Sequence, residues 1–348
     1  MKKTFLYDQH KKLHAKMIDF AGYQLPVWFN SIKEEHLAVR QKVGVFDISH
    51  MGVLIFSGSG ASDFLQSISC NDIQKTIPDK MIYSMVLNEM GGVLDDIMVG
   101  RLQDQYVMVV NSSNKEKLHR WFQQHQSENV TIQDLERSHG FLALQGPLAI
   151  QTAFNVLDIN CEKHPRFSVW EQSVFGETLL VMRTGYTGED GIEMVIPKAV
   201  LPKIWQSLLA SGVTPCGLGA RDTLRIEAGL PLYGQELTEN IHPLMTRYKW
   251  VVKFDTLFHG KESLQAIQQS PSDLVAVGIE MDKKQIPRPQ CRIVEGGYVT
   301  SGTLSPLLDK AIGMAYVKVP FADLGSSVHV EIRGQSCLAM VVALPFIP

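Results

Sequence analysis

Apolar residues crowd three short stretches between residues 81 and 111, and polar residues and glycines separate these stretches. The runs 81–87, 93–99 and 106–111 have the length and the β-branched content that are typical of strands. Gly91 and Gly92 lie between the first two runs, and glycine favours a tight turn because it adopts positive φ without a steric penalty. The pattern therefore predicts a meander of three strands.

The middle strand of this meander carries two carboxylates, Asp95 and Asp96, within an otherwise apolar run. Successive side chains on a strand point to opposite faces, so the two aspartates cannot both face one cavity. Because the neighbours on both faces are apolar, we expect at least one carboxylate to need a partner. That partner is either a protein group or a cationic or proton-bearing ligand, and the pattern leaves both interpretations open.

The rest of the first 268 residues alternates between helical and strand-like periods. Ser31 with Glu34 three residues later is a capping pattern, and it predicts a helix that runs to about Val43. Residues 8–20 read as one amphipathic segment, and residues 168–183 read as two strands joined at Gly176. Further helices are expected at 61–67, 113–124, 199–210 and 217–228, and a further strand at 141–145.

The pattern of apolar and polar residues changes after the Ser270-Pro271-Ser272 stretch, which is typical of a linker. Short apolar runs separated by glycine and proline turns predict a small all-β barrel or sandwich. These runs are 274–280, 291–295, 311–318, 327–333 and 337–344. We therefore expect a mixed α/β body over residues 1–268, built of two subdomains, and a β domain over residues 273–348.

Composition narrows the classes of function. The chain has 348 residues, a formal net charge of −3 and 45% hydrophobic residues, and this balance does not favour a broad basic face for nucleic acid. Its five cysteines are scattered and form no C-x-x-C pair, as expected in a reducing cytosol without structural zinc. No run is long enough to span a bilayer, so we expect a cytoplasmic protein. The histidines are scattered as well, and metal chemistry is not indicated.

The glycine-rich loop from Thr184 to Glu193 is a candidate site. It lacks the glycine spacing of phosphate-binding and dinucleotide-binding loops, and its acidic residues argue against phosphate. A glutamate at the start of a strand, here Glu193, can accept two parallel N–H bonds from a ring that presents donors. The alternative interpretation is a polar hairpin loop without a ligand.

Arg221 is a second candidate, because the helix dipole disfavours a cation at a predicted helix start. A bidentate contact with a ligand carboxylate or ring oxygen would explain it, and so would an ion pair with Asp222, Glu227 or another acid. His50 lies in a polar break between two strands, where a lone histidine is more often a structural hydrogen-bonding group than a base.

Eight stretches in order along the chain resemble the aminomethyltransferase family, the T-protein of the glycine cleavage system. They are 19–23 (DFAGY), 45–52 (VFDISHMG), 91–96 (GGVLDD), 183–191 (RTGYTGEDG), 217–222 (GLGARD), 232–234 (LYG), 260–262 (GKE) and 300–302 (TSG). Any one of them is a weak signal, whereas the ordered set is specific.

The resemblance implies an α+β fold with three parts arranged as a cloverleaf, in which two mixed α/β portions surround a folate cavity and a C-terminal β barrel follows. It implies transfer of a one-carbon unit from the aminomethyl-lipoyl arm of H-protein to tetrahydrofolate, with release of ammonia and formation of 5,10-methylenetetrahydrofolate. No metal is required. H-protein is the implied partner, and neither nucleic acid nor a membrane is implied.

The resemblance also implies roles for single residues. The second aspartate of the pair, Asp96, matches the catalytic position at the folate nitrogens. Glu193 and Arg221 match folate-binding positions. Four more residues match positions expected to line the pterin cavity: Met51, Tyr83, Asn111 and Tyr186.

The chain departs from the family pattern at residues 244–249, which are bulkier and more basic, and it stops at Pro348 where family chains commonly run on. Both departures bear on the donor side rather than on folate binding. Two related functions share the body of this fold: a folate-dependent demethylase, which would carry a flavin domain, and a folate-binding scaffold without catalysis. The scaffold is the alternative from a different class of function.

Overall fold

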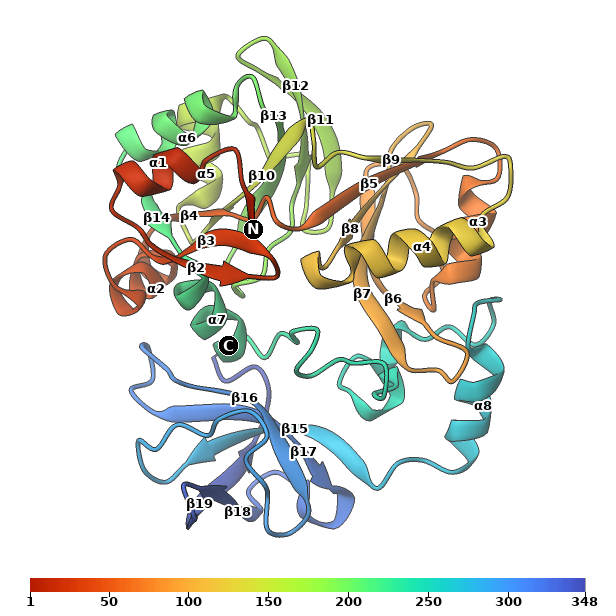
Figure 1. Cartoon of the computed structure of the whole chain (residues 1–348), viewed down its shortest axis with the longest axis vertical. Coiled ribbons are helices and arrows are strands. Elements are labelled where there is room, and N and C mark those ends of the chain that lie inside the picture. The colour runs from red at the N-terminus through yellow and green to blue at the C-terminus, as the bar shows by residue number, and fades with distance from the viewer. Residues whose placement is uncertain (348) are drawn as a thin grey trace. The chain divides into compact units, whose positions relative to one another are not determined.

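Two compact units make up the computed structural model, which describes residues 1–347 (Figure 1). Pro348, the last residue of the predicted β domain, lies outside the described residues. Unit 1 comprises residues 1–65, 72–83 and 97–221, and unit 2 comprises residues 66–71, 84–96 and the described residues from 222 onward. Among the described residues, no helix is long and apolar enough to cross a membrane.

The main sheet of unit 1 has six strands. In spatial order they are β11 (Val169–Val174), β12 (Glu177–Met182), β13 (Gly191–Pro197), β10 (His139–Gln145), β4 (Gly44–Asp47) and β14 (Thr214–Cys216). All neighbours pair antiparallel except β14 and β4, which are parallel. The expected pair of strands joined at Gly176 is confirmed as β11 and β12.

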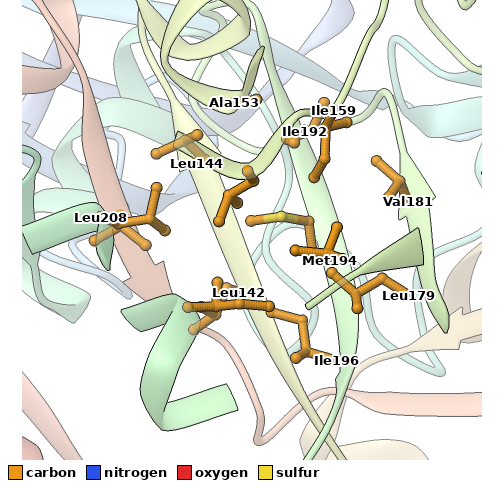
Figure 2. Close-up of a cluster of buried hydrophobic side chains, with 14 of the residues drawn as sticks. Leu142, Leu144, Ala153, Ile159, Leu179, Val181, Ile192, Met194, Ile196 and Leu208 are labelled. Carbon is orange, nitrogen blue, oxygen red and sulfur yellow. The ribbon is translucent and has the colours of Figure 1, made fainter. Parts of the chain in front are cut away.

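Helices cover one face of this sheet. They include α5 (Ala149–Leu157), which packs on β10, β13 and α6 (Leu201–Ala210). Leucine, isoleucine and methionine side chains from the strands and helices form the buried cluster in Figure 2. Leu142 and Leu144 on β10 and Met194 and Ile196 on β13 are each fully buried in it. At about 25 cal/mol per Å² of buried apolar surface, such a cluster is a principal stabilising element of unit 1.

A small three-stranded sheet of β1 (Lys2–Lys3), β3 (Tyr23–Trp28) and β2 (Lys16–Phe20) lies at the start of the chain. The prediction of one amphipathic segment over 8–20 is wrong, because α1 ends at Lys12 (Tyr7–Lys12) and β2 follows. Positive φ values at Ala21 and Gly22 close a turn that lets β2 pair with β3. The ladder hydrogen bonds of this hairpin override the weak helical period.

Helix α2 (Ile32–Gln41) begins as its sequence predicts. The Ser31 Oγ accepts a hydrogen bond from the Glu34 backbone N–H at 3.1 Å, which satisfies one of the unpaired donors of the first turn. Helix α7 (Leu218–Glu227) and η2 (Pro243–Met245), η3 (Lys249–Val251) and α8 (Lys261–Gln269) follow later in the chain.

The predicted meander is confirmed in a five-stranded sheet. Its order is β6 (Lys80–Leu87), β7 (Val93–Arg101), β8 (Tyr106–Val110), β5 (Gly52–Ser57) and β9 (Thr131–Asp134), and it is accompanied in the chain by α3 (Ala61–Ile68), η1 (Ser112–Asn114) and α4 (Lys115–His125). The turn between β6 and β7 is built by Asn88, whose Oδ1 accepts from the backbone N–H groups of Met90 and Gly92. Gly91 has a φ of +81°, and a Cβ on Gly92 would lie 1.8 Å from the Glu239 carbonyl oxygen. Both glycines are therefore required.

The C-terminal part of unit 2 is a five-stranded antiparallel sheet. Its order is β16 (Gly297–Leu304), β17 (Ala311–Lys318), β15 (Leu274–Met281), β19 (Gln335–Val342) and β18 (Ser327–Ile332), with η4 (Val319–Phe321) between β17 and β18. The prediction of an all-β portion after the linker is confirmed.

One strand of that sheet differs from the prediction. The run 291–295 is no strand, because Arg292 and Ile293 form only isolated bridges before a turn at Gly296 and Gly297. The strand is instead 297–304, where serine, threonine and glycine dilute the apolar signal. A Cβ on Gly302 of this strand would lie 1.8 Å from the Pro287 carbonyl oxygen, so close packing of the backbone has replaced a hydrophobic side chain.

Candidate functional site

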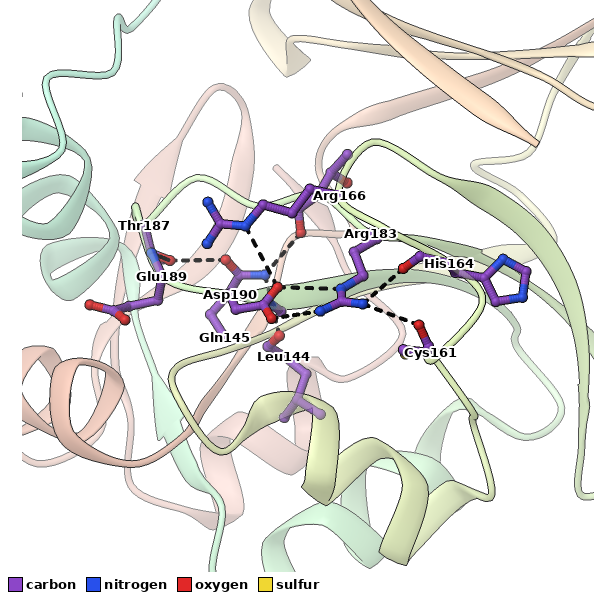
Figure 3. Close-up of polar contacts among 11 residues, drawn as sticks. Leu144, Gln145, Cys161, His164, Arg166, Arg183, Thr187, Glu189 and Asp190 are labelled. Carbon is purple, nitrogen blue, oxygen red and sulfur yellow. Dashed lines mark hydrogen bonds and ion pairs between the residues drawn. The ribbon is translucent and has the colours of Figure 1, made fainter. Parts of the chain in front are cut away.

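The glycine-rich loop between β12 and β13 is clamped at its base by an ion pair (Figure 3). The guanidinium of Arg183 donates to both carboxylate oxygens of Asp190, at 3.3 Å from Nε and 2.7 Å from Nη2. Its Nη1 also donates to the carbonyl oxygens of Cys161 and His164. Partial burial alone would raise the pKa of Asp190, but the hydrogen bonds and charge of Arg183 hold that pKa below its ordinary value.

A second arginine supports the far side of the loop. Arg40 on α2 has a side chain that is only 4% exposed, and its Nη1 donates to the Thr187 carbonyl oxygen at 2.7 Å. The same atom pairs with a carboxylate oxygen of Glu189 at 2.9 Å. The loop is therefore a fixed structure rather than a flexible polar hairpin.

Glu193 lies two residues into β13, where it pairs with Ala143 on β10. Its Oε2 accepts a hydrogen bond from the Thr184 hydroxyl at 2.5 Å, and its Oε1 has no hydrogen-bond partner within residues 1–347. The residue keeps some solvent contact, yet desolvation of the carboxyl raises its pKa, while Thr184 and the positive charge of Arg221 act in the opposite direction. A desolvated carboxylate with one unused oxygen is suited to accept an N–H from a ligand.

Arg221 comes from the first turn of α7 and lies beside the same loop. Its guanidinium carbon is 4.5 Å from the centroid of the Tyr186 ring, which is a cation–π contact. Of the two acids considered as ion-pair partners, Asp222 binds Arg225 at 2.8 Å and Glu227 accepts from Ser305. Glu193, Arg221 and Tyr186 therefore come together as one cluster in unit 1.

The polar break after β4 is a tight turn held by Asp47. The Asp47 carboxylate accepts from the backbone N–H and hydroxyl of Ser49, and it also binds Thr4 and the buried His10. This turn presents His50, which is 2% exposed and packs edge-on against Phe20. Burial and the nearby charge of Arg221 lower the pKa of His50 to about 3, so its imidazole is neutral at physiological pH.

Met51 and Asn111 lie at the same end of two paired strands. Gly52 on β5 is opposite Val110 on β8, Met51 directly precedes the first and Asn111 directly follows the second. Both residues are partly exposed. Tyr83 is a partly exposed residue in the middle of β6.

Asp95 and Asp96 differ as strand alternation requires. Asp95 is fully buried and Asp96 is partly exposed. In unit 2, Asp96 lies close enough to Tyr248 to help raise the pKa of that phenol, although burial is the larger cause. Tyr248 donates to the Gly229 carbonyl oxygen at 3.1 Å and belongs to the segment that departs from the family pattern.

Sequence reasoning missed two groups that organise the loop, Gln145 and Arg40. Gln145 ends β10 and is fully buried beneath the loop, and Arg40 lies in the last turn of α2. A charged residue at a helix end and a glutamine at a strand end carry no local signal of this role. The one hint in the sequence was a polar glutamine at the end of an otherwise apolar strand, directly before Gly146 and Pro147.

Comparisons with known proteins agree with this architecture. The model described as GCVT N-terminal domain matches residues 6–256, and the model described as glycine cleavage T-protein C-terminal barrel domain matches residues 275–347. A solved structure, the glycine cleavage system aminomethyltransferase T of Bartonella henselae, is 31% identical and superposes with a TM-score of 0.94 over 99% of this chain and 98% of that one. The predicted α+β class is confirmed, and the chain has the glycine cleavage T-protein fold.

Relatives of known identity extend along the whole chain. Aminomethyltransferases of Bacillus pumilus, Thermus thermophilus and Desulforamulus reducens are 44%, 43% and 41% identical, and each alignment covers at least 99% of this chain and 98% of the relative. The chain belongs to the aminomethyltransferase family of the glycine cleavage system, as its ordered motifs predict. It is a folate-dependent transferase.

Proposed function

We propose that this chain transfers a one-carbon unit from the aminomethyl-lipoyl arm of a glycine cleavage H-protein to tetrahydrofolate. Ammonia, 5,10-methylenetetrahydrofolate and the dihydrolipoyl arm are the products. The observation that carries the proposal is the desolvated Glu193 carboxylate, with one oxygen unused and Arg221 nearby, in a chain of this family. The reaction takes place in the cytoplasm and needs no metal, nucleic acid or membrane.

In this proposal Glu193 and Arg221 bind tetrahydrofolate. A pterin ring presents N–H donors beside a carbonyl oxygen, and a carboxylate accepts such donors through short, charge-assisted hydrogen bonds. Arg221 supplies the complementary donor for a ring oxygen or a folate carboxylate. Its stacking on Tyr186 restricts the guanidinium before the ligand arrives, which reduces the entropy that binding costs.

Met51, Asn111, Tyr83 and Tyr186 are proposed to line the pterin site. Met51 and Asn111 lie next to each other's strands, at the paired ends of β5 and β8, and Tyr186 stacks on Arg221. Their partly exposed side chains are available for contact with a flat, partly apolar ring. The assignment of Tyr83 rests on the family pattern and on its partial exposure.

Asp96 is proposed as the group that assists the chemistry. Tetrahydrofolate attacks as an amine, and ammonia must leave from an S–CH2–N centre. A carboxylate at the reacting nitrogen accepts its proton and stabilises the positive charge that develops on the methylene carbon. Asp96 is partly exposed, whereas Asp95 is fully buried, and this difference supports Asp96 as the member of the pair that meets a substrate.

A transfer assay tests the proposal. Ammonia release should require aminomethylated H-protein and tetrahydrofolate together, and omission of either should abolish it. Folate binding without turnover in the presence of an authentic donor would instead identify a scaffold. Residues 244–249 depart from the family pattern on the donor side, so H-proteins from more than one source should be compared as donors.

Thermal unfolding provides an independent test of folate binding. Tetrahydrofolate at about one hundred times its dissociation constant should stabilise the native state by about 2.7 kcal/mol. A melting temperature that does not change over a wide folate range would contradict the binding site itself.

A further inference from the structure

Gln145 lies between the end of β10 and the glycine-rich loop, and it reaches both sides of the loop's tip (Figure 3). We propose that Gln145 is a positioning residue that fixes the loop in the form that binds tetrahydrofolate, without contacting the ligand itself. This inference rests on the proposed function of the Glu193 cluster. Gln145 lies outside the eight stretches that resemble the family pattern.

Three hydrogen bonds tie the Gln145 amide in place. Its Nε2 donates to the carbonyl oxygens of Leu144 at 3.2 Å and Thr184 at 3.1 Å. Its Oε1 accepts from the Thr187 hydroxyl at 2.9 Å, and that hydroxyl in turn accepts from the Glu189 backbone N–H at 3.2 Å. One buried amide therefore holds the loop on both sides of residues 185 and 186.

Packing leaves the amide no alternative position. Gln145 is fully buried, and a Cβ built on Gly185 would lie 1.9 Å from its Oε1. A Cβ on Gly191 would lie 2.6 Å from its Nε2. The two glycines thus leave room for the amide, and any shift of the amide breaks hydrogen bonds that water cannot replace in this buried place.

The loop residues that Gln145 fixes are the ones that hold the proposed ligand-binding groups. Thr184, whose carbonyl binds the amide, places its hydroxyl on Glu193. Tyr186 lies between the two anchored residues and stacks on Arg221. A displaced loop would therefore disturb both the carboxylate and the guanidinium, although within residues 1–347 neither is hydrogen-bonded to the Gln145 amide.

The amide is required because its surroundings offer one hydroxyl donor, on Thr187, and two carbonyl acceptors, on Thr184 of the loop and Leu144 of β10. Glutamate has the same shape but would place an oxygen against both carbonyl groups. Leucine would remove the donor to the Thr184 carbonyl oxygen and the acceptor of the Thr187 hydroxyl. Gln145→Glu and Gln145→Leu should each raise the dissociation constant of tetrahydrofolate by at least about tenfold.

A kinetic separation distinguishes positioning from catalysis. In both variants the KM for tetrahydrofolate should rise while kcat at saturating folate is retained, because the loop contributes binding that is equal in the ground and transition states. Gln172→Glu on β11 is the matched control, since in the described part of the chain, residues 1–347, that amide donates only to the carbonyl oxygen of the exposed Ser173. Unchanged folate affinity in folded Gln145→Leu, or a fall in kcat alone, would overturn the inference.

A double-mutant cycle protects the test against general loss of stability. Gly185→Ala should weaken folate binding strongly in the native background, where the new methyl meets the Gln145 amide. In a Gln145→Ala background the same change should have almost no further effect, because the obstructing amide is gone. Additive effects on folate affinity in this cycle would show that the amide and the loop are not coupled, and would overturn the inference.

Tetrahydrofolate binding by the native protein distinguishes a failure of this inference from a failure of the proposed function. If the native protein binds tetrahydrofolate and the cycle is additive, only the role of Gln145 is wrong. If the native protein does not bind tetrahydrofolate, the proposed function fails first. The cycle, measured on thermal unfolding instead, should still show the coupling of Gln145 with Gly185.

Discussion

The two faces of β10 and β13 differ in what they contribute. On one face, Leu142, Leu144, Met194 and Ile196 enter the buried apolar cluster of unit 1 (Figure 2). On the other face, Glu193 pairs in register with Ala143, and Gln145 pairs with Gly191 at the edge of the loop. Figure 3 shows the Gln145 side chain. The same backbone therefore supports a hydrophobic core and a candidate binding site.

The comparison teaches which property of a side chain matters on each face. The apolar face depends on buried volume, and side chains of similar size can replace one another at modest cost. The polar face depends on donors and acceptors at fixed positions, and a single change of an amide or carboxylate leaves a buried group without a partner. Substitutions on the two faces should therefore separate stability from folate affinity.

The largest effect is expected where alternation places a carboxylate toward substrate, at Asp96 on β7. Asp96→Asn should lower turnover by about a hundred- to ten-thousand-fold, because the amide cannot accept the proton. Asp95→Asn, the buried neighbour, should instead lower the free energy of unfolding by about 1–3 kcal/mol and leave turnover per folded molecule nearly intact. Turnover and thermal midpoint should be measured for both variants. The reverse result would show that the assignment of the two faces of β7 is wrong.

Glu193→Gln and Arg221→Ala test the polar face of the sheet and the helix beside it. Each should weaken tetrahydrofolate binding by about 2–5 kcal/mol, the usual loss when one partner of a buried, charge-assisted contact is removed. Direct titration with tetrahydrofolate provides the measurement, and circular dichroism checks that the variants are folded. Native affinity in both variants would place these residues outside the folate site.

Leu144→Ala tests the apolar face of β10, since Leu144 lies between Ala143 and Gln145, whose side chains point to the opposite face. Removing this fully buried side chain should lower the free energy of unfolding by about 2–5 kcal/mol through lost burial and the cavity left behind. The folate affinity of the folded protein should stay at the native value. Chemical denaturation measures the free energy of unfolding, and folate titration of the same preparation measures the affinity. A parallel fall in affinity would show that the two faces are coupled.

The smallest expected effect is the pH dependence of Glu193, and its sign follows from burial. Because the folded state raises the pKa of this carboxyl above its ordinary 4.5, the folded chain holds the proton more tightly than the unfolded chain. Its contribution to stability is therefore greatest below that value and is lost as pH rises through the raised pKa. The difference in unfolding free energy between the native chain and Glu193→Gln should fall as pH rises. A difference that increases with pH would contradict the desolvation of this group.

Much of the fold was readable because its signals are local. The Ser31 cap, the Gly91-Gly92 turn and the strand alternation around Asp95 and Asp96 each depend on residues within a few positions of one another. The strand at 16–20 was missed because its partner strand, and not its own pattern, stabilises it. The strand at 297–304 was missed because small residues there allow close backbone packing. The predicted boundary between residues 268 and 273 stays a prediction.

The sequence by itself determined most of the helices and strands, the family and the residue types at the candidate site, since motifs and periodicity are properties of neighbouring residues. Only the tertiary structure decided which groups act together. It placed the Gln145 amide on Thr184, 39 residues away, and stacked Arg221 on Tyr186. It also buried His50 and reduced the solvation of Glu193, and so shifted their pKa values. Contacts between distant segments and the loss of solvent arise when the chain packs, and no local pattern encodes them.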